Sequence, residues 1–254
     1  MDIRDAAVHT EGDRLQRTQL PGVTPMVKWI MIANAIVFLA QNLLGTEFQQ
    51  ELLDFGALSV GRVVAGYLWQ PATYMWLHGS LMHVLFNMFA LWMFGGVLES
   101  LWGSRRFLRF YLQCGIGAGV IIFLWNAMLG FPYPTLGASG AIFGLLTAFS
   151  LMWPERTVFI FPFPVPIKAI WFIPILFGLQ FMWGGERISY VGHLGGVLIA
   201  GFIMRDELLR ALKLRNLRYY WHRLRMRRRL RTVRKDEFDR KRRSRDDDDR
   251  PTFH

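Results

Sequence analysis

The sequence contains a single cysteine, Cys114, among 254 residues. One cysteine excludes an intramolecular disulfide and any metal site built from several thiolates. Residues 1–22 are polar and lack an apolar core, so they do not resemble a cleavable signal peptide. No internal repeat is visible, which argues against the repeat-based folds of many transporters.

Excess charge of one sign is missing from most of the chain. Residues 1–204 hold 11 Lys and Arg against 10 Asp and Glu, a net of +1. Residues 205–254 hold 19 against 9, a net of +10. The basic character therefore belongs to a C-terminal tail. Such a tail can bind nucleic acid, but its place directly after an apolar segment favours anionic lipid headgroups.

Apolar residues are abundant. The chain is 52% hydrophobic, with 21 Phe, 12 Met and 10 Trp, a composition typical of a multi-span membrane protein. We predict an all-α, polytopic fold with six transmembrane helices. The six apolar segments are 26–44, 80–101, 107–129, 137–153, 167–183 and 190–204.

The basic residues of the short loops predict the orientation of the chain, because such residues concentrate on the cytoplasmic side. They precede the first segment, follow the second and fourth, and fill the tail, whereas the alternate loops carry only Arg62 and Arg187. We therefore expect both termini in the cytoplasm. The loops 45–79, 130–136 and 184–189 then lie outside, as in a multi-pass protein of a bacterial inner membrane.

Polar side chains stand out in "HGSLMHVLFN". His78 precedes the second segment, and His83 and Asn87 lie within it, four residues apart and so on one helix face. Polar groups at membrane depth are costly and face the interior of a bundle. One interpretation is hydrogen bonding to another helix. A metal site is not expected, because no third convergent ligand is apparent.

Two other segments carry a serine and a histidine next to small-residue faces. Ser139 precedes Gly140 and Gly144, and His193 lies beside a face formed by Gly192, Gly196 and Ala200. Such faces allow two helices to approach closely. Contact between them would bring the Ser139 hydroxyl near the His193 imidazole.

A serine next to a histidine suggests nucleophilic catalysis. A hydroxyl is a weak nucleophile until a base removes its proton, and histidine is the usual base. His83, Asn87 and the Ser139 backbone N–H would be the donors to an oxyanion. Because no membrane-embedded carboxylate is placed to orient the base, we expect a Ser–His dyad rather than a triad.

The chain resembles the rhomboid family of intramembrane serine proteases in four motifs. They are "HGSLMHVLFN", "ESLWGSRRF", "GASGAIFG" and "GHLGG", within residues 26–205. The resemblance implies that Ser139 is the nucleophile and His193 the general base, with His83 and Asn87 in the oxyanion hole. No metal or cofactor is implied.

The resemblance also assigns supporting roles. Phe143 would pack on the His193 ring, and Gly137 would let the loop before Ser139 approach the scissile peptide. Glu99 and Arg106 match a structural part of the family pattern.

One departure from the family pattern concerns the first long loop. Many rhomboids have a Trp-Arg pair in this loop, whereas this chain has Trp69-Gln70. The departure leaves open how the loop is braced.

We therefore predict three regions: a cytoplasmic segment 1–25, a six-span protease domain 26–205, and a basic cytoplasmic tail 206–254, partly helical. The predicted function is an endopeptidase that cleaves single-span or multi-span membrane proteins near the outer face of the bilayer. No nucleic acid is expected to bind, and the oligomeric state stays open. Two alternatives are an inactive rhomboid-like protein that binds membrane helices and, less well supported, a small-solute transporter.

Overall fold

The computed structural model describes residues 22–131, 133–160, 163–183 and 190–211. Among them, three helices are long and apolar enough to cross a membrane by length and composition. These are α2 (Pro25–Leu43), the continuous run of α6 (Leu81–Ala90), η2 (Leu91–Gly95) and α7 (Gly96–Trp102), and α8 (Ser104–Leu129). Three shorter apolar helices follow: α9 (Ser139–Met152), α10 (Phe172–Trp183) and α11 (Tyr190–Ile203). The all-α membrane bundle expected from the sequence is confirmed.

Large apolar side chains cover the outside of the long helices. Trp29, Ile36, Leu124 and Met128 are all exposed on α2 and α8. Water would not favour so much exposed apolar surface, whereas hydrocarbon chains of lipid would. The protein is therefore an integral membrane protein.

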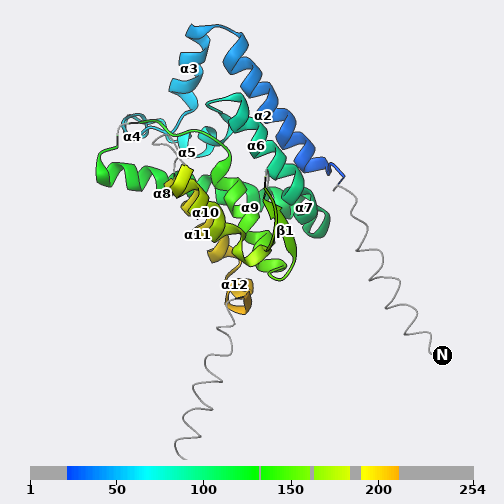
Figure 1. The fold of residues 1–254 in the computed structure, drawn as a ribbon. Coiled ribbons are helices and arrows are strands. Elements are labelled where there is room, and N and C mark those ends of the chain that lie inside the picture. The colour runs from blue at the N-terminus through cyan, green and yellow to red at the C-terminus, as the bar shows by residue number, and fades with distance from the viewer. Residues whose placement is uncertain (1–21, 132, 161–162, 184–189, 212–254) are drawn as a thin grey trace, which may run out of the picture. The chain divides into compact units, whose positions relative to one another are not determined.

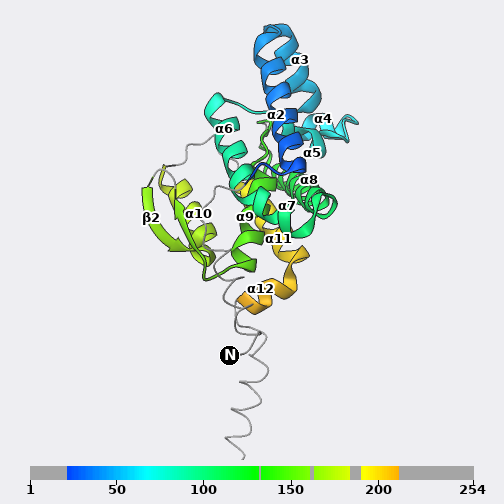
Figure 2. The same ribbon diagram turned by 90° about the vertical axis from the view of Figure 1, so that its right-hand side faces the viewer.

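The fifth span begins later than predicted. Two antiparallel strands, β1 (Thr157–Ile160) and β2 (Phe163–Lys168), come before η3 (Ala169–Trp171) and then α10. Figure 1 labels β1 of this pair and Figure 2 labels β2. The difference lies in residues 167–171: Ile167 and Lys168 pair with Val158 and Thr157 of β1, and the next three residues form η3.

Helix α9 lies in the middle of the bundle (Figures 1 and 2). Every residue from Gly140 to Leu151 is buried, as expected for a helix that is apolar on all sides. Its glycines allow close approach: a Cβ on Gly144 would lie 2.5 Å from the Cβ of Cys114 on α8, and one on Gly196 of α11 would lie 1.9 Å from the Gly140 carbonyl oxygen. The predicted contact between the two small-residue faces is confirmed.

The carboxylate of Glu99 on α7 binds the start of α2 and the first residue of α8. It accepts hydrogen bonds from the backbone N–H groups of Met26 (2.8 Å) and Val27 (2.9 Å) and from the hydroxyls of Thr24 and Ser104. An anion is favourable at this position because the first N–H groups of a helix have no intrahelical acceptor. The structural role expected of Glu99 thus involves the α2 N-terminus.

Arg106, which the sequence grouped with Glu99, has a different environment. Its guanidinium lies over the Trp102 ring, 5.5 Å from the ring centroid.

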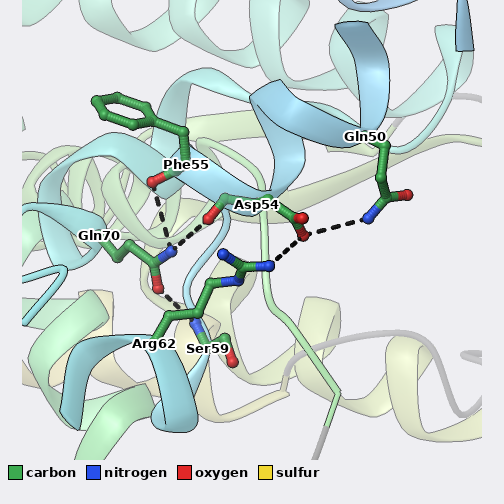
Figure 3. A network of polar contacts seen from close by, with 6 residues as sticks. All are labelled: Gln50, Asp54, Phe55, Ser59, Arg62 and Gln70. Carbon is green, nitrogen blue, oxygen red and sulfur yellow. Dashed lines mark hydrogen bonds and ion pairs between the residues drawn. The ribbon is translucent and has the colours of Figure 1, made fainter. Parts of the chain in front are cut away.

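The loop between α2 and α6 is folded into short helices: α3 (Thr46–Gly56), α4 (Val60–Val64), α5 (Gln70–Thr73) and η1 (Tyr74–Trp76). Gln70 is fully buried at their centre. Its amide nitrogen donates to the Asp54 and Phe55 carbonyls at 3.0 and 3.4 Å, and its amide oxygen accepts from the Ser59 N–H at 3.0 Å (Figure 3). Gln70, at the position where the resemblance leads us to expect an arginine, therefore braces this loop.

An ion pair and an aromatic contact complete the same network. Arg62 of α4 pairs with Asp54 of α3 at 2.7 Å, and Gln50 donates to the same carboxylate at 3.2 Å (Figure 3). The Trp69 ring stacks on Phe55 with centroids 5.2 Å apart. These contacts join α3, α4 and α5 into one unit.

The chain divides into two units between Met204 and Arg205. In the second unit the structure describes only α12 (Arg205–Ala211). Most of the basic tail, with its predicted lipid contacts, lies outside the described residues, as do residues 1–21.

Candidate active site

Ser139 is the first residue of α9 and is half-buried. The first backbone N–H groups of a helix have no intrahelical acceptor and are available to an anion. Gly137, two residues earlier, has a φ of +123°, which side-chain-bearing residues rarely adopt. A Cβ on Gly137 would lie 2.6 Å from Cε1 of His83, so the glycine also makes room for that ring.

The segment before Ser139 is held by the loop between α2 and α6. Leu58 and Thr135 exchange two backbone hydrogen bonds of 2.9 Å, and the Gly137 N–H donates to the Tyr74 carbonyl at 2.9 Å. The hydroxyl of buried Tyr74 donates to the Gly115 carbonyl of α8 at 2.8 Å. The position of Ser139 thus depends on a loop more than 60 residues earlier in the chain.

His193 is buried in the first turn of α11. Its ring stacks on Phe143, with centroids 4.3 Å apart and planes 10° from parallel; Phe143 lies one turn after Ser139 on α9. A Cβ on Gly140 would lie 3.3 Å from the Gly192 carbonyl oxygen. The residues next to Ser139 and His193 are therefore in backbone contact, and the stacked contact expected of Phe143 is present.

His83 and Asn87 lie one turn apart on α6. Ser80 caps this helix, because its hydroxyl accepts from the His83 N–H at 3.2 Å. The His83 ring lies against Gly137, as described above. The amide nitrogen of Asn87 is buried and has no hydrogen-bond partner among the described residues.

His78 lies behind His83, with ring centroids 5.0 Å apart. It is fully buried, and its backbone is bonded to the side chain of Gln41 on α2 at 2.9 and 3.3 Å. Burial, and secondarily the neighbouring His83, lower the pKa of His78 to about 4. His78 is therefore neutral near pH 7 and supports the His83 ring by packing.

The arrangement can be compared with known proteins. The sequence model of the Rhomboid domain matches residues 65–210, more than half of the chain. This chain belongs to the rhomboid family. It is 35% identical over 187 residues to Rhomboid protease GluP of Bacillus subtilis, covering 72% of this chain and 35% of that protein.

Two further rhomboid relatives carry mitochondrial names. Rhomboid protein 1, mitochondrial, of Saccharomyces cerevisiae is 37% identical over 130 residues, 48% of this chain and 37% of that protein. Presenilin-associated rhomboid-like protein A, mitochondrial, of Danio rerio is 32% identical over 156 residues, 58% of this chain and 40% of that protein. The chain thus spans 35% to 40% of the length of these three relatives.

The rhomboid motifs did not reveal every residue around His193. Nδ1 of the imidazole lies 2.8 Å from Oε1 of Gln180 on α10. Elsewhere in the site the motifs also missed Tyr74, whose carbonyl accepts from the Gly137 N–H, and Gln41, whose side chain bonds to the His78 backbone. A signal for Gln180 exists in the sequence, since it is a lone amide in the apolar run "PILFGLQFMW" and polar groups at membrane depth usually have a task.

Proposed function

We propose that this chain is an intramembrane serine endopeptidase in which Ser139 is the nucleophile and His193 the general base. The observation that carries the proposal is the contact of α9 with α11, where Gly140 meets Gly192 and Phe143 stacks on the His193 ring. This contact joins the segments that carry the hydroxyl and the imidazole at the start of both helices. Membership of a family that includes named proteases supports it.

The reaction would proceed by acyl transfer. The Ser139 oxygen attacks the scissile carbonyl carbon while its proton moves to Nε2 of His193. The carbon–nitrogen bond then breaks, and the proton moves from Nε2 to the leaving amine. Water attacks the resulting ester, gives its proton to Nε2, and Ser139 is released with that proton returned.

The developing oxyanion needs donors that are already in place. We assign this role to the Ser139 N–H, the Asn87 amide and the His83 ring. The unpartnered Asn87 amide and the approach of His83 to Gly137 support the assignment. Because Gly137 has no side chain, the His83 ring can lie this close to its backbone.

The substrates would be membrane proteins with one or more spans, cut near the outer end of a helix. An intact helix keeps its carbonyls bonded, so the substrate must unwind before its peptide reaches Ser139. We further propose a bacterial inner membrane with both termini cytoplasmic, and a basic tail on anionic lipid. No cofactor enters this scheme.

Reconstitution tests the function directly. Wild-type protein and the Ser139→Ala and His193→Ala variants are incubated in vesicles with a labelled single-span substrate. We expect cleavage by the wild type and none above background by either variant. Equal cleavage by all three would refute the assignment. No cleavage by correctly folded wild type, across several substrates, would favour the inactive, helix-binding alternative.

A further inference from the structure

The side chain of Gln180 meets the edge of the His193 ring. Oε1 of the amide lies 2.8 Å from Nδ1 of the imidazole. With the amide oxygen facing the ring, this bond forms when Nδ1 carries the hydrogen, because an amide oxygen only accepts a hydrogen bond. In a neutral imidazole the other nitrogen, Nε2, then has a free lone pair. This is the tautomer that a general base uses when Nε2 takes the proton.

The backbone of Gln180 is hydrogen-bonded as well as its side chain. The Tyr190 hydroxyl, from the first residue of α11, donates to the Gln180 carbonyl at 3.1 Å. This bond and the imidazole bond join α10 to α11 at one residue. Phe177, three residues earlier on α10 and so on nearly the same face, packs on Phe143 with ring centroids 5.5 Å apart. The His193 imidazole is therefore contacted on its face by the Phe143 ring and at its edge by Gln180 of α10.

We propose that Gln180 is the positioning residue for His193, so that the site acts as Ser–His–Gln rather than as an unassisted Ser–His pair. This inference rests on the proposed function. A neutral amide does in an apolar region what a carboxylate does in a Ser–His–Asp triad: it selects the tautomer and the orientation of the ring. It does so without the cost of placing a carboxylate among apolar helices.

The kinetic test uses three variants of the full chain. Gln180→Leu removes the acceptor, Gln180→Glu keeps an acceptor oxygen at similar length, and Met182→Leu changes an exposed residue of the same helix. Because the lost bond acts on the base and not on substrate binding, Gln180→Leu should lower kcat about three- to tenfold with KM unchanged. Gln180→Glu should recover most of that loss, and Met182→Leu should match wild type.

A spectroscopic test does not depend on turnover. The chain is labelled with ¹⁵N-histidine, and the His193 signals are assigned by their disappearance in His193→Asn. At neutral pH the wild type should show a protonated Nδ1 and a bare Nε2. Gln180→Leu should show a mixture of the two tautomers, while Gln180→Glu should stay close to wild type.

The outcomes separate this inference from the proposed function. An unchanged kcat in Gln180→Leu, or the same His193 nitrogen signals in Gln180→Leu and wild type, would overturn the role of Gln180 while cleavage by Ser139 stands. Equal losses in Gln180→Leu and Gln180→Glu, together with lower unfolding temperatures, would also overturn it, because they would indicate packing alone. If wild type and Ser139→Ala cleave equally, the proposed function itself fails.

Discussion

Substituting Gly196 with alanine places one methyl group in the contact between α9 and α11. The added Cβ would lie 1.9 Å from the Gly140 carbonyl oxygen and 2.8 Å from its carbonyl carbon. Ordinary contacts between carbon and oxygen are about 3.3–3.6 Å. Both obstacles are backbone, so neither can rotate away, and the helices must separate by roughly 1.4 Å or more to restore such a contact.

Two consequences follow from that separation. Overpacking of a close contact costs about 1–3 kcal/mol of folding free energy. The displacement would also move His193 away from Ser139, and a misplacement of about 1 Å can reduce a rate by roughly 100-fold. We therefore expect Gly196→Ala to lose most of its activity even where it remains folded.

The assay compares Gly196→Ala with Gly178→Ala, which adds the same methyl group to α10 where no described atom apart from its chain neighbours and its own helix backbone lies within 4 Å. Thermal unfolding in detergent measures stability, and substrate cleavage in vesicles measures turnover. Gly178→Ala should match wild type in both. Wild-type turnover in Gly196→Ala would refute the reasoning that close packing of these two backbones builds the site.

Three further predictions concern other residues. The variants His83→Ala and Asn87→Ala should each lower kcat by up to about 10²–10³-fold, because each removes a donor to the oxyanion. Leu85→Ala, on the exposed face of α6, should leave kcat unchanged. If His83→Ala and Asn87→Ala both turned over like wild type, neither residue could be assigned to the oxyanion hole. Glu99→Ala leaves the Met26 and Val27 N–H groups without their acceptor, so the free energy of unfolding should fall by about 1–3 kcal/mol. Replacing the exposed Glu51 with alanine should not lower it. The pKa of His78 is lowered to about 4 in the folded protein, so between pH 6.5 and 4 the unfolded chain binds more protons than the folded one. The free energy of unfolding should therefore fall as the pH drops through this range, by up to about 3 kcal/mol. In His78→Asn the unfolding free energy should depend less on pH, and parallel pH profiles for the variant and wild type would contradict the prediction.

The sequence alone located most of the apolar helices and the contact between the helices that carry Ser139 and His193. Long apolar runs cannot remain in water, so their lengths predicted five of the six spans closely, and the glycine spacing around Ser139 and His193 predicted the α9–α11 contact. Both signals are local, because the spacing of apolar and small residues along one helix indicates which of its faces is buried. The roles of these residues in catalysis remain predictions.

Other features depended on the tertiary structure. Local signals did not predict the pairing of β1 with β2, because an apolar, proline-rich run can either begin a helix or form strands. Nor did they pair Gln70 with Ser59, Glu99 with the α2 N-terminus, or Gln180 with His193. A hydrogen-bond partner 11 to 75 residues away is chosen by which helix faces meet. Apolar periodicity predicts that a helix face is buried, but not which polar group on the neighbouring element contacts it.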